Sequence, residues 1–314
     1  MSIYKKFLNS HLLSYIKTKV LIMDHFFPII IEQSLLYFPL VAGAYISFSL
    51  MKLPDLSIES AYLFGGLFAG MALPFMQEWP APALLLAMIL ISCAGGMVVG
   101  ATSGCITIFG KIPHLLSSII TLGIYHGLFH MFSKPYASLS QYKNSLAAIS
   151  CLETYPELCT IAFLFVLISI GLTFLFSTQL GYTFSIFGNN SLFLKHFGIS
   201  IPYVFLAGIL SANALAGLAG YFFAQTNNLV EINMGVGKSL FCISALILGR
   251  TCIEKSVSIL IPLCGTVSYF LLQQSLVRIG FNLKYFTAIQ ALVVLILLLL
   301  LYKKLDKKID HLGV

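Results

Sequence analysis

Residues 187–198 read Phe-Gly-Asn-Asn-Ser-Leu-Phe-Leu-Lys-His-Phe-Gly, a polar segment bounded by glycines that separates two long apolar runs. The run Leu158–Phe176 precedes this segment, and the run Tyr203–Ala224 follows it. A helix needs roughly 20 apolar residues to cross a bilayer, and each run is of that length. The pattern predicts a short helix between two membrane spans, on the lysine-rich side, where a soluble partner can dock.

The composition excludes a soluble globular protein. Hydrophobic residues make up 59% of the 314 residues and charged residues only 9%, with a net charge of +7. A soluble domain carries about 25% charged residues. The lysines flank apolar runs, as at Lys5–Lys6 and in the tail pairs Lys303–Lys304 and Lys307–Lys308. This is the charge pattern that places flanks in the cytoplasm, so it indicates a lipid bilayer as the partner and no nucleic acid.

Nine apolar segments are candidate spans, and together they predict an all-α, polytopic membrane helix bundle. They are Ile29–Met51, Ile58–Met76, Ala81–Cys105, Ile112–Phe132, Leu158–Phe176, Tyr203–Ala224, Ser239–Gly249, Val257–Val277 and Phe286–Leu301. The seventh is short and is expected to begin earlier, near Asn233. We divide the chain into an amphipathic interfacial segment (1–27), a transmembrane domain (28–302) and a cytoplasmic basic tail (303–314).

Lysine-rich flanks are expected in the cytoplasm, and this rule conflicts with a full crossing by Ile58–Met76. With the basic tail in the cytoplasm, nine full spans would place the lysine-rich N-terminus outside. This segment follows Pro54-Asp55 and contains Gly65, Gly66 and Gly70. Broken helices at membrane depth are tolerated where they line a cavity or are buried in protein. The prediction is about eight full spans plus one re-entrant or discontinuous segment, with the N- and C-termini in the cytoplasm. The alternative is nine spans with the N-terminus outside.

Two acidic residues mark a candidate pathway. Asp55 and Glu59 lie four residues apart, with Ser57 between them. Acidic groups in membrane segments are costly and often functional, so they bind a solute or cation, or they cap a helix N-terminus. Asn213 and Asn233 are further polar groups near this pathway. Their alternative role is interhelical hydrogen bonding.

The sequence lacks an assembled set of catalytic groups. Gly235–Ser239 resembles the end of a phosphate-binding loop, but Ile232 stands where the leading glycine is required. His126 and His130 are four residues apart, without the glutamate of a zinc-protease motif and without a third ligand. We therefore expect no enzyme activity, no metal site and no cofactor.

Three stretches in order carry a family resemblance. Leu53–Ser60 reads Leu-Pro-Asp-Leu-Ser-Ile-Glu-Ser, residues 110–121 read Gly-Lys-Ile-Pro-His-Leu-Leu-Ser-Ser-Ile-Ile-Thr, and the third extends from Phe187 to Gly237. Over roughly residues 35–300 the chain resembles permease subunits of ATP-binding-cassette (ABC) importers in the branched-chain amino acid/ribose permease superfamily. The closest branch is that of tryptophan/tyrosine-type uptake systems. The chain departs from the family pattern at Ser60, Ala61, Ser185 and Arg250.

The resemblance implies a multi-pass subunit of the bacterial inner membrane that imports a small, amino-acid-like solute by alternating access. It implies a dimer of separate ABC ATPase subunits, an extracytoplasmic solute-binding protein and a second permease copy in a homodimer. The residues expected to couple to the ATPase are Gly188, Asn189, Asn190, Lys195, His196, Phe197 and Gly198. Those expected along the substrate pathway are Asp55, Ser57, Glu59, Asn213 and Asn233. The rival hypothesis is an ion-coupled secondary transporter that uses Asp55 and Glu59.

Overall fold

The computed structural model of the chain describes residues 26–132, 136–147, 156–253 and 258–280, with isolated positions between 288 and 296. Most of these residues are helical, which confirms the predicted all-α class. Seven helices within the described ranges are long and apolar enough to cross a membrane. Residues 1–25 and the tail 303–314 lie outside the described residues, as does most of the predicted span Phe286–Leu301.

The helices follow the apolar runs of the sequence closely. They are α2 (Phe26–Ala44, continued by a π-helical turn Tyr45–Leu50), α3 (Ser57–Ala72, continued by a 3₁₀ turn Leu73–Met76), α4 (Ala81–Gly110), α5 (His114–Phe132), α6 (Pro156–Ser177), α7 (Gln179–His196), α8 (Ile201–Thr226), α9 (Lys238–Cys252) and α10 (Leu260–Arg278). Phe26, the first described residue, already belongs to α2.

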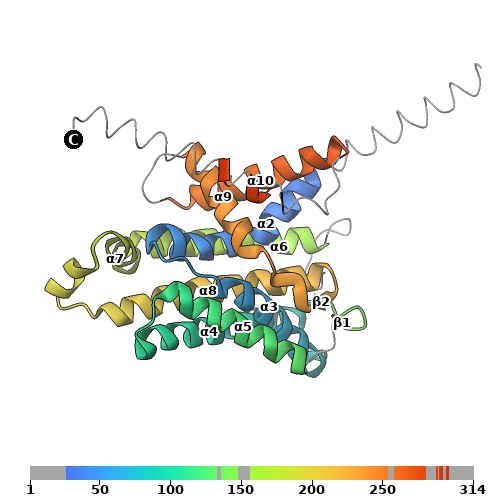
Figure 1. Ribbon diagram of the computed structural model, residues 1–314. Coiled ribbons are helices and arrows are strands. Elements are labelled where there is room, and N and C mark those ends of the chain that lie inside the picture. The colour runs from blue at the N-terminus through green and yellow to red at the C-terminus, as the bar shows by residue number, and fades with distance from the viewer. Residues whose placement is uncertain are drawn as a thin grey trace, which may run out of the picture.

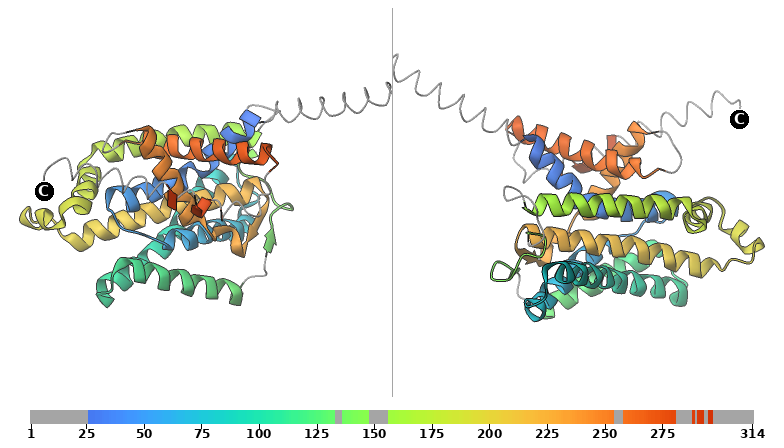
Figure 2. Two further views of the ribbon diagram at one scale, coloured as in Figure 1. Left: turned by 45° about the horizontal axis from the view of Figure 1, so that its top comes forward. Right: turned by 180° about the vertical axis from the view of Figure 1, so that it is seen from behind.

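Helix α7 and a small β ladder mark opposite ends of the bundle (Figures 1 and 2). The ladder consists of β1 (Tyr136–Ser138) and β2 (Leu229–Glu231), which pair antiparallel. Helices α4, α5, α6 and α8 lie between the two ends, roughly along the line that joins them. We call these ends the α7 end and the β end.

Helix α8 forms the centre of the bundle and packs against α2, α3 and α4. Small residues permit this close packing, as is common where lipid removes the usual hydrophobic driving force. Gly217 of α8 lies between Gly65 of α3 and Gly96 of α4, and a Cβ atom on Gly217 would overlap the α4 backbone. The glycines therefore let three helix backbones meet.

The chain is irregular between α2 and α3, at residues 51–56. Asp55 contacts Asn213, about halfway along the 26-residue α8. Farther along α3, Gly70 faces Val230 of the β ladder. Helix α3 therefore occupies the half of the bundle nearest the β end. With its 3₁₀ continuation, Ser57–Met76 is one of the seven helices long and apolar enough to cross a membrane, and its predicted incomplete crossing stays a prediction. The three glycines of this segment lie in an unbroken helix, contrary to the prediction that they interrupt it, because they meet neighbouring backbone or side chains.

A second irregular segment lies between β2 and α9. It contains a 3₁₀ turn, Ile232–Gly235, and Gly237, whose φ of +79° is a left-handed conformation that glycine adopts readily. Gly235 packs against the backbone of Glu59 in the first turn of α3. The predicted span Ser239–Gly249 thus begins earlier, as expected. Both α3 and α9 start inside the bundle, close to each other.

Candidate functional site

A buried carboxylate joins the start of α3 to α8. Asp55 is fully buried, and its two oxygens accept hydrogen bonds from the Ser57 backbone N–H at 2.9 Å and from Asn213 Nδ2 at 3.0 Å. The Ser57 hydroxyl also donates to Asp55. The contact with the Ser57 N–H satisfies one of the free donors at the α3 N-terminus. The structure therefore brings together three of the five predicted pathway residues.

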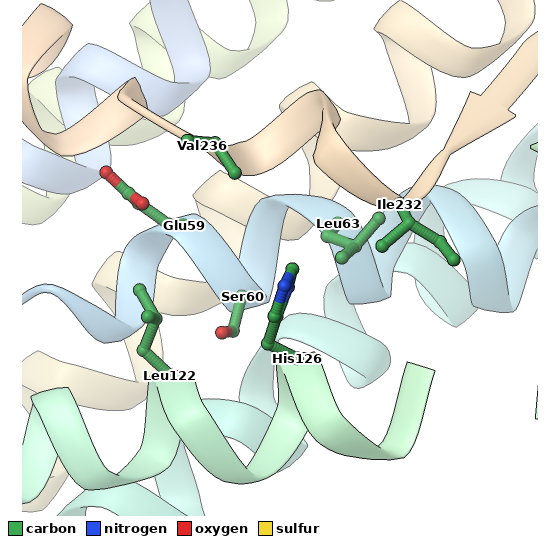
Figure 3. A pocket seen from close by; sticks show the side chains of 7 residues that line it. All are labelled: Glu59, Ser60, Leu63, Leu122, His126, Ile232 and Val236. Atoms are coloured by element: carbon green, nitrogen blue, oxygen red, sulfur yellow. The ribbon is translucent and has the colours of Figure 1, made fainter. Parts of the chain in front are cut away.

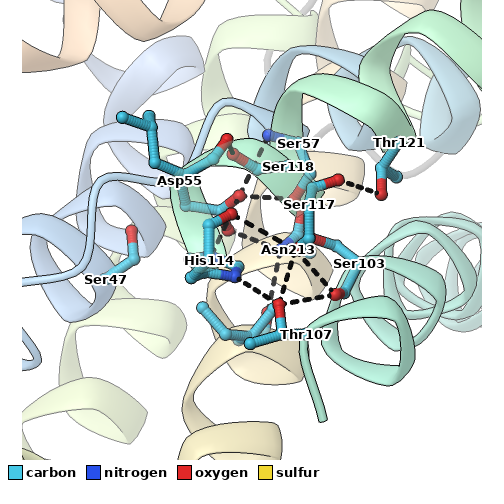
Figure 4. Close-up of polar contacts among 12 residues, drawn as sticks. Ser47, Asp55, Ser57, Ser103, Thr107, His114, Ser117, Ser118, Thr121 and Asn213 are labelled. Atoms are coloured by element: carbon cyan, nitrogen blue, oxygen red, sulfur yellow. Dashed lines mark hydrogen bonds and ion pairs between the residues drawn. The ribbon is translucent and has the colours of Figure 1, made fainter. Parts of the chain in front are cut away.

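His114 extends this network to α4 and α5 (Figure 4). Its Nε2 lies 3.6 Å from an Asp55 oxygen, and its Nδ1 lies 3.2 Å from the Thr107 hydroxyl. Ser117 contacts both Thr107 and the carbonyl of Ser103. The sequence interpretation missed His114 and its polar partners, although His114 lies within the family-like stretch 110–121. The network ties α3, α4, α5 and α8 together at one level.

Glu59 is partly buried and caps a different helix from its own. Its Oε1 accepts a hydrogen bond from the Ser239 backbone N–H at 3.0 Å, in the first turn of α9. A carboxylate at this position is favoured by the helix dipole. Capping was one of the two roles expected for the acidic pair, and the structure shows it for both residues, with Glu59 acting across the bundle.

Glu59 also lines a small open pocket (Figure 3). Its other lining residues are Ser60, Leu63, Leu122, His126, Ile232 and Val236. The cavity volume is about 30 Å³, enough for one or two water molecules and too small for an amino acid. The predicted pathway residue Asn233 is exposed and is not among the lining residues. His126 and His130 face each other at 3.3 Å, and no group of three or more metal-ligating residues assembles within the described ranges.

The predicted coupling segment belongs to a longer helix than expected. Helix α7 begins at Gln179, and Asn190 interrupts it with φ −155° and ψ 88°. Gly188 was expected to open a short helix, but it lies within the first part of α7 and packs against the Leu50–Met51 backbone. The short helix after the kink therefore begins beyond Asn190 and ends before Gly198, whose φ is +74°.

The segment after this kink presents apolar and basic side chains at the α7 end of the bundle. Phe197 and Leu192 are each 66% exposed, and Phe193 is 46% exposed. Lys195 and His196 are exposed beside them. Asn189 accepts a 2.6 Å hydrogen bond from Lys52 Nζ, which links this segment to the irregular chain that precedes Asp55. The seven predicted coupling residues thus gather at one end of the molecule.

Comparisons with known proteins place the chain in a family. Residues 29–301 match the family described as branched-chain amino acid transport system / permease component. The chain is 30% identical over 267 residues to a tyrosine transport system permease protein of Clostridioides difficile (strain R20291), covering 83% of this chain and 87% of that protein. It is 27% identical over 264 residues to an uncharacterized protein of Rickettsia prowazekii (strain Madrid E), covering 80% and 89%.

A shorter match, 26% identical over 163 residues, is to an autoinducer 2 import system permease protein of Enterobacter sp. (strain 638), covering 51% of this chain and 47% of that protein. No solved structure matches the chain. The family match covers most of the chain and all but the first three residues of the described bundle. The chain therefore belongs to the branched-chain amino acid permease family, as a non-catalytic, multi-pass membrane component of an ABC transporter of the bacterial inner membrane.

Proposed function

We propose that the protein forms the translocation pathway for an amino-acid-like solute, imported by alternating access under the control of a separate ATPase dimer. The exposed segment at residues 191–198 carries this proposal. Its aromatic and basic side chains form the kind of amphipathic surface on which a soluble subunit docks. A second permease copy and an extracytoplasmic binding protein complete the assembly, with the α7 end in the cytoplasm.

The contacts of the coupling segment suggest how closure of the ATPase reaches the pathway. Gly188 rests on the Leu50–Met51 backbone, and Asn189 is bonded to Lys52. From Lys52, two residues of irregular chain, Leu53 and Pro54, lead to Asp55, which anchors the start of α3. A displacement of α7 would therefore move the irregular residues 51–56 before it moves α3. Alternating access needs such an element with two arrangements, each favoured by a different state of the ATPase.

The partners of Asp55 argue against the ion-coupled alternative. Each of its oxygens has a hydrogen-bond donor, and His114 lies nearby. A carboxylate that is already bonded in this way is suited to hold helices together. We therefore assign Asp55, Ser57 and Asn213 a positioning role beside the pathway.

Substituting Phe197→Asp is expected to reduce recovery of the ATPase with the permease at least about tenfold. The variant loses the contact of a large aromatic residue in the docking surface and adds a carboxylate that must be desolvated when the subunits meet. The measurement is the amount of ATPase that co-purifies with tagged permease from membranes.

The matched control is Phe75→Asp, since Phe75 is 87% exposed and lies in the 3₁₀ turn that follows α3, away from α7. It should leave ATPase recovery unchanged. Equal recovery of the ATPase with the Phe197→Asp variant and the wild type would remove the coupling assignment.

A further inference from the structure

Two histidines face each other in the last two turns of α5. Nε2 of His126 lies 3.3 Å from Nε2 of His130, and the two ring planes make an angle of 84°. Residues four apart on a helix lie on the same face, so the unbroken α5 holds both rings in this position. Between neutral imidazoles this contact is a hydrogen bond, in which one ring donates and the other accepts.

The separation of the two nitrogens is also the one that a shared metal ion requires. A tetrahedral Zn²⁺ binds imidazole nitrogen at about 2.0–2.1 Å, which places two such nitrogens about 3.3–3.4 Å apart. The Nε2 atoms of His126 and His130 already lie 3.3 Å apart. An ion that replaces the shared proton therefore needs a rotation of the rings and no change in the path of the helix.

Both imidazoles are accessible near the β end of the bundle. His130 is exposed and His126 is partly exposed. Helix α5 ends at Phe132, shortly before β1, so the pair lies close to this end. His126 also lines the small open pocket that contains Glu59, which has room for one or two water molecules (Figure 3). An ion held by two imidazoles keeps positions for water, and this pocket provides space for it beside His126.

The ligand set limits the kind of site that this pair can form. We expected no metal site from the sequence, because a third ligand is missing, and no group of three metal-ligating residues occurs in the described ranges. A closed structural zinc site needs four protein ligands, so the pair does not form one. Two imidazoles with water instead make an exchangeable site. Imidazole suits Cu²⁺, Zn²⁺ and Ni²⁺, whereas Ca²⁺ and Mg²⁺ prefer oxygen ligands.

We propose that His126 and His130 form an exchangeable binding site for a divalent transition-metal ion (Cu²⁺, Zn²⁺ or Ni²⁺) at the β end of the bundle. Both Nε2 atoms coordinate the ion, and water fills the remaining positions. The ring that donates the hydrogen bond gives up its Nε2 proton and takes one up on Nδ1 through solvent, so both rings stay neutral. The bound ion links two consecutive turns of α5.

The test measures binding of Zn²⁺ and of Cu²⁺ to the full-length permease, purified in detergent without a histidine tag, by isothermal titration calorimetry. His126→Gln and His130→Gln should each weaken binding at least about tenfold, since the loss of a ligand costs no less than the loss of a group that supports one. A large excess of Mg²⁺ should not compete in the wild type. Electron paramagnetic resonance of the Cu²⁺ complex should show coupling to ring nitrogens, which each single variant reduces.

A matched control keeps the number of histidines and changes only their spacing. His130→Gln combined with Met131→His moves the second imidazole to a position about 140° around the helix from His126. Met131 is 78% exposed, so a histidine there displaces no packed neighbour. Binding to this double variant should be as weak as binding to His130→Gln. Cys105→Ser, which removes an exposed thiol of α4, should bind like the wild type.

Three results would overturn the assignment. The first is the absence of Zn²⁺ and Cu²⁺ binding to the wild type, and the second is wild-type affinity in both His126→Gln and His130→Gln. The third is wild-type affinity in the double variant that contains Met131→His. Elution of each variant as a single species shows that it is folded. None of these measurements depends on uptake, so each result leaves the proposed function intact.

Discussion

Gly217→Leu is expected to prevent the bundle from folding, with a loss of about 3 kcal/mol or more of stability. Gly217 lies between α3 and α4, and any side chain on it would overlap backbone atoms that no rotamer change can move. Helices α3, α4 and α8 would have to move apart, which would break the contacts that position Asp55. The measurement is the fraction of protein that elutes as a single species from detergent-solubilised membranes.

Gly171→Leu is the control for this prediction. Gly171 lies on α6, and an added Cβ atom there meets nothing within 4 Å. The control should elute like the wild type, because leucine favours a helix and contacts lipid at this position. Normal folding of Gly217→Leu would show that α8 does not pack between α3 and α4 as described.

Asp55→Ala is expected to destabilise the protein by about 3–5 kcal/mol, because it removes the central acceptor of a buried polar network. The substitution leaves the Ser57 N–H without its acceptor, removes one of the two acceptors of Asn213 Nδ2 and takes away the carboxylate beside His114. Equilibrium unfolding in mixed detergent micelles measures the loss. Glu78→Ala, at an exposed position between α3 and α4, should change stability by less than about 0.5 kcal/mol.

The same substitution distinguishes a positioning role from an ion site. If Asp55 held a coupling ion, Asp55→Ala would keep wild-type stability and lose a dependence of uptake on a sodium or proton gradient. That result would contradict the network described around this carboxylate.

Much of the fold follows from local sequence. The apolar runs fix the helices, and Pro54-Asp55 marks the start of α3 correctly because proline restricts the residue before it and aspartate accepts from the following N–H groups. The glycines at residues 65 and 66 were misinterpreted, because glycine that breaks a helix and glycine that lets two helices meet look alike in sequence. Only the position of α8 distinguishes them.

The candidate site was predictable in part. Asp55, Ser57 and Asn213 were expected near one pathway, and the structure joins them. Gly188 was wrongly expected to start a helix. Glycine is required at this position because the Leu50–Met51 backbone, distant in sequence, packs against it. The aromatic surroundings of Lys238 could not be foreseen. The rings of Tyr37, Tyr62 and Phe223 come from α2, α3 and α8 and meet around this lysine only in the folded bundle.

Uptake in proteoliposomes that contain the permease, with and without its ATPase, tests the central claim most directly. Our account predicts that solute enters only when the ATPase is present and ATP is available on the α7 side, and that uptake persists when the proton gradient is collapsed at constant ATP. Uptake by the permease alone, driven by an imposed proton or sodium gradient, would contradict it.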